Sequence, residues 1–197
     1  MRGKMTHAIE ALVLFLLSLP SDCRFNVCSI GSKLKFIFDE ARSVPYNAAN
    51  AEHAIAEVKK FKADFGGLDI YTPLRTVLEM ESDCKKTDIF LLTDGAVENT
   101  DDIIELVENE CNLDRRVHTL GLGQGVDEKL ITKCAAKGFG NYYLIRDYAN
   151  LEYKVIDALT QTQLNYLVLQ NLVFLDATNA KIQLNWLKDC IVPLKNA

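Results

Sequence analysis

Three loops hold the side chains that are best placed for chemistry: residues 66–73, 93–102 and 121–127. Each lies where a ligand would bind in an open α/β sheet, beyond the carboxyl ends of the strands. Asp94 ends the apolar run "TDIFLLTDG", and its carboxylate could contact Mg²⁺ directly or through a water. The competing interpretation is a turn aspartate in front of a glycine, which is a common pattern. The residues alone leave both interpretations open.

The loop 121–127 invites comparison with a dinucleotide-binding fingerprint. It has Gly121 and Gly123, but the position of the third glycine is Val126. That side chain would obstruct close helix packing and phosphate approach. The pattern therefore favours a flexible turn between a strand and a helix over a nucleotide site.

The remaining ionisable residues predict no catalytic centre. The acidic residues between 98 and 110 are typical of a solvated helix face rather than of a second metal site. His7, His53 and His118 stand near no recognisable serine or cysteine nucleophile motif. Hydrolases are therefore disfavoured.

The segments that must position these loops alternate between two hydrophobic patterns. Strands are predicted at 24–32, 34–39, 87–95, 115–123 and 141–147, and helices at 47–64, from about Pro73, and at 100–111, 127–138 and 151–163. This alternation predicts an α/β fold whose mostly parallel sheet is covered by helices on both faces. The apolar run 87–95 is typical of a strand buried on both of its faces.

The two ends of the chain depart from this alternation. The N-terminal stretch has a basic start and an apolar run at 8–19, but Pro20 and Asp22 make a poor signal-peptide cleavage site. We interpret it as a buried helix that Pro20 ends. Residues 165–187 resemble two strands around a turn at 176–180. The predicted division is therefore an α/β domain over 1–163 and, over 164–197, a β hairpin or the start of a truncated β domain.

Composition limits the possible classes of protein. The chain has 197 residues, 49% apolar and 25% charged, which fits one globular domain with a short extra element. A net charge of −5 and scattered basic residues argue against nucleic-acid binding. The apolar run at 8–19 is too short for a membrane span, which needs ~20 residues. Six cysteines without C-x-x-C spacing favour reduced thiols and a cytoplasmic location, with an extracellular one as the alternative.

Five segments, in this order and spacing, resemble the von Willebrand factor type A domain over roughly residues 1–160. They are "LPSDCRFNVCSIGS", "FGGLDIYTPL", "IFLLTDGAVENT", "VHTLGLGQGVDEKLI" and "GNYYLIRD". The branch found in inter-alpha-trypsin inhibitor heavy chains and related intracellular proteins is the most similar. The resemblance implies a doubly wound α/β sheet with a metal-ion-dependent adhesion site at its top.

Only part of that metal site has a counterpart here. The family holds Mg²⁺ with a D-x-S-x-S loop after the first strand, a threonine in a middle loop and an aspartate after the fourth strand. Asp94 matches the aspartate, Leu68 replaces the threonine, and Thr72 is four residues beyond it. Met1 matches the methionine that often ends the D-x-S-x-S loop, so this loop and the first, central strand are expected to be missing.

Three explanations of the missing strand stay open. The chain is a fragment, its start is an internal methionine, or another segment such as 165–176 fills the position. The resemblance implies a non-enzymatic module that binds protein partners, within a larger chain or assembly, through a degenerate site that needs no cofactor. The alternatives are a Mg²⁺-dependent adhesion domain whose metal loop lies upstream and a nucleotide-binding α/β enzyme.

Overall fold

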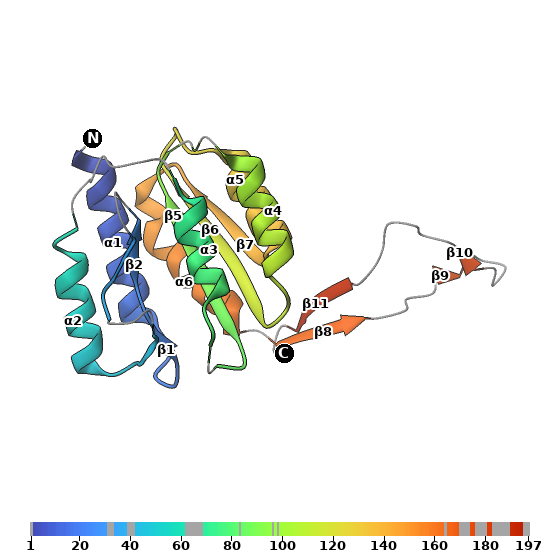
Figure 1. The fold of residues 1–197 in the computed structure, drawn as a ribbon, viewed down its shortest axis with the longest axis horizontal. Helices are drawn as coiled ribbons and strands as arrows, with labels where there is room; N and C mark the ends of the chain where they lie inside the picture. Colours follow the sequence, from blue (N-terminus) through green and yellow to red (C-terminus); the bar gives the residue numbers. More distant parts are fainter. Residues whose placement is uncertain are drawn as a thin grey trace. The chain divides into compact units, whose positions relative to one another are not determined.

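The computed structural model describes residues 2–30, 34–38, 42–61, 69–82, 84–95, 97 and 99–163, together with short strands beyond residue 164. Two compact units divide the chain, at residues 1–159 and 160–197. The first unit contains α1 (Arg2–Ser18), β1 (Arg24–Phe25), β2 (Cys28–Ile30), β3 (Leu34–Phe36), β4 (Val44–Pro45), α2 (Ala48–Val58), α3 (Tyr71–Glu79), β5 (Thr87–Thr93), α4 (Thr100–Glu110), β6 (Arg115–Leu122), α5 (Glu128–Lys137), β7 (Phe139–Ile145), the 3₁₀ turn Tyr148–Asn150 and most of α6 (Leu151–Gln163) (Figure 1).

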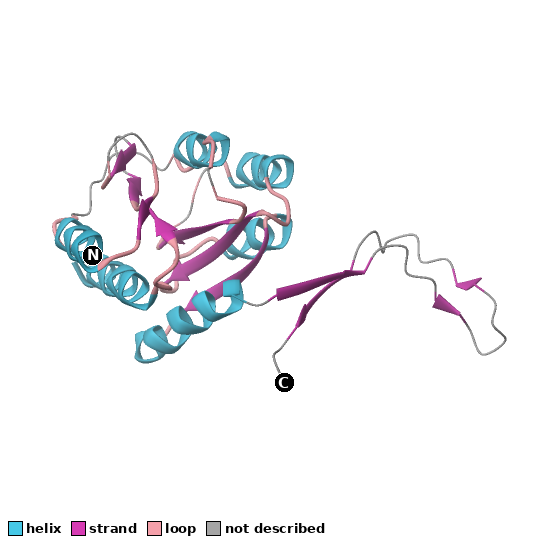
Figure 2. Ribbon diagram, turned by 90° about the horizontal axis from the view of Figure 1, so that it is seen from below, coloured by secondary structure: helices cyan, strands magenta, loops and turns pink. Residues whose placement is uncertain are grey.

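A parallel three-stranded sheet in the order β5-β6-β7 forms the centre of this unit. Helices cover both of its faces (Figure 2). Leu74 of α3, Ile103 of α4 and Leu130 of α5 pack in one core cluster, while Phe15 of α1 and Val155 of α6 pack in another. The predicted α/β fold with a parallel sheet and helices on both faces is confirmed.

Both faces of β5 are covered, as predicted: Ile89 and Leu91 pack with α3 and α4, and Phe90 and Leu92 pack with α1 and α6. In the described part of the chain, β5 pairs with β6 alone, and Leu91 is its single fully buried residue. Every residue of β6 after Arg115 is buried, because β6 lies between two strands. The apolar sequence of β5 is that of an interior strand, but among the described strands only β6 pairs with it.

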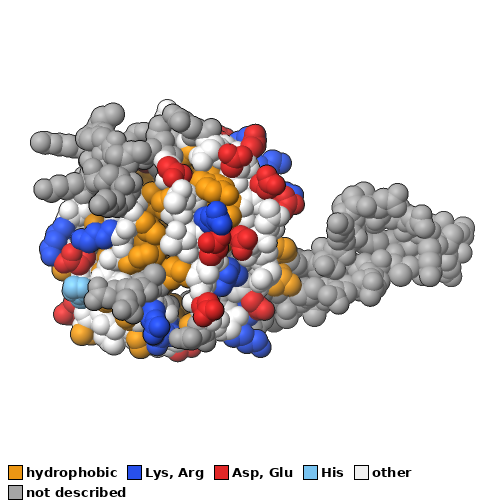
Figure 3. Space-filling view, in the orientation of Figure 1, with side chains coloured by type: hydrophobic (Ala, Val, Ile, Leu, Met, Phe, Trp, Pro, Cys, Tyr) orange, Lys and Arg blue, Asp and Glu red, His pale blue; other side chains and the backbone are white. Residues whose placement is uncertain are grey.

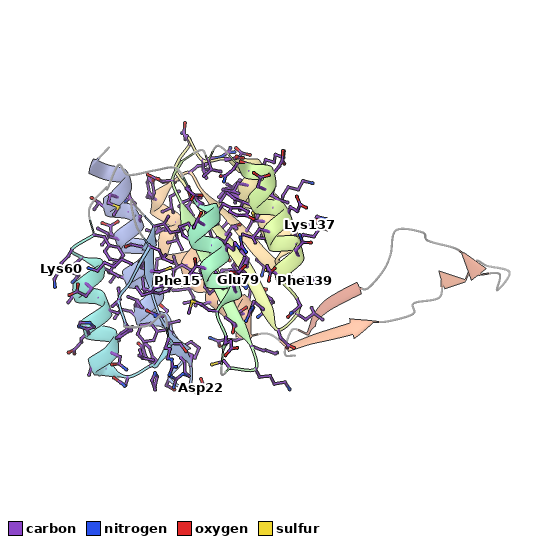
Figure 4. The ribbon with its side chains drawn as sticks, in the orientation of Figure 1. Phe15, Asp22, Lys60, Glu79, Lys137 and Phe139 are labelled. Carbon is purple, nitrogen blue, oxygen red and sulfur yellow. The ribbon has the colours of Figure 1, made fainter. Side chains whose placement is uncertain are left out.

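Helix α1 confirms the buried-helix interpretation in part. It ends at Ser18, before Pro20, and buries Ala11, Phe15 and Leu16. Figure 4 shows Phe15 between the helix and the sheet. Leu17, in contrast, is 61% exposed, so the helix is not buried all round. In the described residues, no helix is long and apolar enough to cross a membrane.

The predicted strand 24–32 is divided into two short strands. Asn26 interrupts it, because its side-chain oxygen accepts the backbone N–H groups of Val27 and Phe38. Residues 24–25 then pair with β4, a strand that the sequence did not predict, while β2 and β3 form the expected antiparallel hairpin. The predicted turn at Gly31-Ser32 lies outside the described residues.

Capping side chains shift several helix boundaries from their predicted positions. Helix α2 starts after Asn47, which accepts the N–H of Asn50, and it ends at Val58 rather than at 64. Helix α3 starts two residues before Pro73, because Asp69 accepts the N–H groups of Tyr71 and Thr72.

The last helices of the first unit lie close to their predicted positions. Helix α4 follows the N-cap residue Asn99, so Thr100 is its first residue. Helices α5 and α6 match their predicted ranges to within one residue at either end.

A bulge between β6 and β7 fixes how these two strands meet. The register shifts between Val117 and Thr119, so that β7 begins at Phe139 instead of the predicted 141. A methyl group on Gly140 would lie 2.1 Å from the Val117 carbonyl oxygen, so only glycine allows this approach. Phe139, next to it, has a φ of 56°, and its ring is 43% exposed (Figure 4).

The second unit contains two antiparallel strand pairs. β8 (Asn165–Leu169) pairs with β11 (Cys190–Leu194), and β9 (Phe174–Leu175) pairs with β10 (Lys181–Ile182). The nested order of the pairs is that of a β hairpin, and the predicted turn at 176–180 lies outside the described residues. The hypothesis that 165–176 fills the missing strand position, in this chain or in a partner, stays a prediction.

Candidate functional site

The three loops that the sequence singled out meet at the carboxyl edge of the sheet. The backbone N–H of Asp127, before α5, donates to the carbonyl of Gly95, after β5, at 3.4 Å. The Thr100 hydroxyl donates to the Asp127 carboxylate. Asp69, before α3, accepts a hydrogen bond from the Asn99 side chain. The three loops that the sequence analysis singled out are therefore in contact with one another in the folded chain.

Asp94 occupies the position that the sequence predicted for it. It directly follows Thr93, the last residue of β5, and its side chain is exposed at this edge. Leu68, the residue expected in place of the metal-binding threonine, lies outside the described residues. Thr72 lies in the first turn of α3, where its N–H and its hydroxyl both bond to Asp69.

The other loop aspartates of this edge serve as caps of the following helices and turns. Asp69 accepts from the N–H of Tyr71, Asp127 from that of Leu130, and Asp147 from that of Ala149. Unpaired N–H groups of a first turn are the usual partners of such side chains. These carboxylates are therefore committed to separate helix and turn starts.

Hydrogen bonding keeps two of these aspartates ionised. The Thr72 hydroxyl, with the Thr72 and Tyr71 amides, lowers the pKa of Asp69. Burial alone would raise the pKa of Asp127, but hydrogen bonds from Thr100 and the Leu130 amide outweigh it and lower the pKa. Each carboxylate is thus stabilised in its charged form by the local backbone that it caps.

The grouping of ligating side chains at this edge bears on whether a metal ion could be held there. Mg²⁺ requires several oxygen ligands in a tight octahedral arrangement. Among the described residues, no three His, Cys, Asp or Glu side chains are grouped so that they could hold a metal. Asp94 remains the one position that carries over from the family pattern.

The glycine loop does not have the form of a nucleotide site. A Cβ atom on Gly121 would lie 2.9 Å from Cγ2 of Val126 and 3.1 Å from Ile131. The Val126 side chain therefore packs directly against the Gly121 backbone, where close phosphate approach would need open space.

The acidic residues of α4 form a solvated face, as predicted. Asp101, Glu105 and Glu108 are exposed, and Lys129 and Lys137 of α5 pair with the first and last of these. Figure 3 shows acidic side chains over the face that α3 and α4 share. A groove of about 500 Å³ between these helices is lined by Glu79, Asp102, Glu105 and Glu110 around Arg75.

A buried charged cluster at the opposite, amino end of the strands was missed by the sequence analysis. Asp88 of β5 accepts from Arg116 at 2.7 Å and lies 3.1 Å from Nε2 of His118, both on β6. Arg116 and His118 are almost fully buried. The sequence does carry a signal for this cluster, because Arg116 and His118 stand at alternate positions of a strand that is otherwise mostly apolar.

The two ring nitrogens of His118 connect β6 to both neighbouring strands. Nδ1 of His118 accepts the backbone N–H of Asn141 at 3.0 Å, opposite the β6–β7 bulge. Because Nδ1 accepts this N–H, Nε2 is the ring nitrogen that faces Asp88, at 3.1 Å. Both ring nitrogens are engaged, so neither can accept a proton from a substrate.

Comparisons with known proteins agree on one family. The von Willebrand factor type A domain family matches residues 1–144. A von Willebrand factor A domain-containing protein of Dictyostelium discoideum is 34% identical over 150 residues, which cover 76% of this chain and 16% of that protein. Von Willebrand factor A domain-containing protein 5A of Rattus norvegicus is 34% identical over 157 residues, or 79% of this chain and 19% of that protein. This chain therefore spans less than a fifth of the length of these relatives.

The solved structures show the same fold. A von Willebrand factor type A protein from Catenulispora acidiphila superposes with a TM-score of 0.70 at 18% identity, covering 85% of this chain and 41% of that one. Proximal thread matrix protein 1 from the mussel byssus, solved with a zinc-occupied MIDAS motif, gives 0.60 at 14% identity, covering 86% and 45%.

Proposed function

The chain belongs to the von Willebrand factor type A domain family, and from this premise we propose that it is a non-enzymatic protein-interaction module with a degenerate metal-ion-dependent adhesion site. Domains of this family generally mediate adhesion and interaction rather than catalysis. The proposed partners are proteins, bound within a larger chain or assembly. The proposed compartment is the cytoplasm, where the free thiols of Cys23, Cys28 and Cys84 would stay reduced.

The proposal rests on the observation that the loop aspartates cap the helices and turns that follow them. A metal site at the carboxyl edge would need oxygen ligands from several loops that converge on one point. Asp69, Asp127 and Asp147 instead each bond to the backbone that follows them. Leu68, which has no oxygen in its side chain, stands where the family has a threonine. Asp94 alone is too small a set of ligands for Mg²⁺.

Calorimetric titration tests this proposal. We expect Mg²⁺ and Mn²⁺ to give no binding heat with the 197-residue chain or with the Asp94→Ala variant. Asp101→Ala is the matched control, because Asp101 is an exposed aspartate of the neighbouring helix α4. A binding heat that Asp94→Ala removes and Asp101→Ala retains would contradict the degenerate site.

The second candidate function is Mg²⁺-dependent adhesion, with a metal loop supplied by sequence upstream of Met1. The exposed position of Asp94 at the edge where three loops meet favours it. The fold neighbour with a zinc-occupied MIDAS motif gives it a precedent in another protein. The same titration on a longer version of the chain separates the two functions, because this candidate predicts heat that Asp94→Ala abolishes.

A nucleotide-binding enzyme is the third candidate. The Val126 side chain packs on the Gly121 backbone, and this contact disfavours a phosphate site there. Binding of a nucleotide to the folded state would raise the melting temperature with ligand concentration. We expect millimolar ATP or NAD to leave the melting temperature unchanged.

A further inference from the structure

We propose that the groove between α3 and α4 is a docking site for a cationic segment of a partner protein, which would enter it with arginine side chains. The proposal deepens the proposed function, because it rests on the chain being a protein-interaction module. It depends neither on Asp94 nor on a metal ion, so the two proposals can fail separately.

The groove runs along one face of each of two neighbouring helices (Figure 1). On α3 its lining residues are Tyr71, Arg75 and Glu79, which are four residues apart and therefore share a face. They span about 12 Å at a rise of 1.5 Å per residue, which is the length of about four residues of an extended chain. The buried Leu106 of α4 and the half-buried Tyr71 supply apolar surface beneath the charged side chains.

Acidic side chains outnumber basic ones in the groove. Four carboxylates and one guanidinium line it, which leaves an excess of three negative charges among the described residues; the carboxylates are those of Glu79, Asp102, Glu105 and Glu110. Figure 3 shows acidic side chains gathered over this face. The guanidinium of Arg75 is already engaged, because its Nε lies 2.6 Å from Oε1 of Glu79. The groove is therefore complementary in charge to a cationic ligand.

The fold neutralises the acidic residues on one side of α4 and not those on the other. Asp101 and Glu108 pair with lysines of the neighbouring helix α5. In the groove, the side chains of Asp102 and Glu105 make no hydrogen bond or ion pair with any described residue. These two carboxylates are available to a cation that docks from outside.

The stability of the helices does not account for these acidic positions. Glu79 and Glu110 are the last residues of α3 and α4, where the helix dipole disfavours negative charge, and neither last turn contains a basic residue. Asp102 and Glu105 are like charges three residues apart, and such neighbours repel each other on a helix. A cation in the groove would relieve both kinds of repulsion.

A polypeptide with arginine side chains fits this groove better than a small apolar ligand does. Small-molecule sites are lined predominantly by apolar side chains, whereas most of the residues that line this groove are polar or charged. Domains of this family mediate protein interactions. A guanidinium binds carboxylates through two parallel hydrogen bonds and also stacks on aromatic rings, so arginine suits a groove that combines carboxylates with Tyr71.

Fluorescence anisotropy of a labelled peptide, in buffer that contains EDTA, tests the proposal on the 197-residue chain. The probe has three Arg residues separated by single Ser residues, because alternate side chains of an extended chain are about 7 Å apart and so follow the length of the groove. In the control peptide citrulline replaces each arginine, which keeps the shape and removes the charge. We expect the arginine peptide to bind with a Kd below about 1 mM and the citrulline peptide not to bind.

Two double variants with the same change in net charge locate the site. Asp102→Asn combined with Glu105→Gln removes two carboxylates of the groove, and we expect the Kd of the arginine peptide to rise about tenfold. Asp101→Asn combined with Glu108→Gln is the matched control on the same helix and should change the Kd by less than about twofold. All four side chains are exposed, so both double variants should fold.

A single variant tests the sign of the charge that the groove prefers. Arg75→Gln removes the guanidinium and releases Glu79, so we expect it to lower the Kd of the arginine peptide.

Three outcomes would overturn the proposal. The first is no binding of the arginine peptide at about 1 mM. The second is an equal loss of affinity in the two double variants, which would show attraction to the net charge of the chain rather than to the groove. The third is a higher Kd for Arg75→Gln, which would make an anion the ligand of the groove. None of these results bears on metal binding at Asp94, which the calorimetric titration decides by itself.

Discussion

An ion pair and a histidine meet at the amino end of the central strands. Arg116 is 2% exposed and His118 is fully buried, and both converge on one oxygen of Asp88. Burying a charge is unfavourable unless it is paired and hydrogen-bonded. The Phe90 ring stacks on His118 at 4.9 Å and separates this cluster from the carboxyl half of β5. Asp88 therefore supplies a carboxylate that offsets the charge of the buried guanidinium.

Removing Asp88 should be far more damaging than removing an exposed aspartate. Asp88→Ala leaves Arg116 buried without its carboxylate, and we expect the free energy of unfolding to fall by about 3 kcal/mol. Asp101→Ala breaks the exposed pair with Lys129 and should change the same quantity by less than about 1 kcal/mol. Urea unfolding followed by circular dichroism measures both variants. Similar small losses would show that Arg116 is solvated after all.

The cap of α3 should make stability depend on pH. The pKa of Asp69 is lowered in the folded chain, so its carboxylate stabilises α3 above the ordinary aspartate range and loses this effect as pH falls through the lowered value. Asp69→Ala should cost about 1 kcal/mol at pH 7, and the difference from wild type should vanish in acid. Asp69→Asn keeps an oxygen acceptor, so its difference from wild type at pH 7 should be smaller. A loss for Asp69→Ala that is constant from pH 7 to pH 3 would contradict the cap.

At the scale of elements, the sequence predicts whatever depends on a residue's own neighbours in the chain. Helix α6 and helix α5 were predicted almost to the residue, because their apolar periodicity and caps are local. The division of 24–32 at Asn26 was missed, because it depends on a contact with Phe38. The half-burial of β5 was missed because it depends on whether strands flank both of its edges, which no pattern within 87–95 reveals.

The candidate site likewise combines features that are local in the sequence with features that depend on distant contacts. Its loops and Asp94 were predicted, because strand ends and turn residues are readable locally. The roles of Asp69 and Asp127 as caps depend on how the backbone turns after them, and the Asp88 cluster depends on the β5–β6 register. Neither the capping roles nor the Asp88 cluster could be predicted from residue types alone.

Among the contacts between elements, we expect the contact between β6 and β7 to tolerate amino-acid substitution least. Gly140→Ala would place a methyl group 2.1 Å from the Val117 carbonyl oxygen, so the strands must separate. We expect a loss of about 3 kcal/mol or failure to fold, as for other overpacked sites. Gly95→Ala is the matched control, because a methyl group there meets nothing within 4 Å. Thermal unfolding of the two variants side by side is the measurement, and equal melting temperatures would show that the β6–β7 contact is looser than described.

On the scale of the whole molecule, two thiols report on the integrity of the core. Burial raises the pKa of Cys111 to about 11 and that of Cys134 to about 12, and both pack in the cluster of α3, α4 and α5. Cys84, in a loop before β5, is half-buried. Alkylation requires the thiolate and access to it.

We therefore expect iodoacetamide at pH 8 to modify Cys84 in the native chain while Cys111 and Cys134 stay unmodified. Peptide mass spectrometry identifies the labelled positions, and the chain in denaturant, where every cysteine should react, provides the control. Native labelling of Cys134 at the rate of Cys84 would mean that this core opens readily.

The position of Phe15 against β6 and α6 has a consequence for synthesis. Helix α1 is synthesised before its cluster partners Leu120, Ile145 and Val155, which follow more than about 100 residues later. At translation rates of ~5–20 residues per second, the helix waits roughly 5–20 s before it can be buried. During that interval its apolar surface is accessible to chaperones, and slower translation would lengthen the exposure.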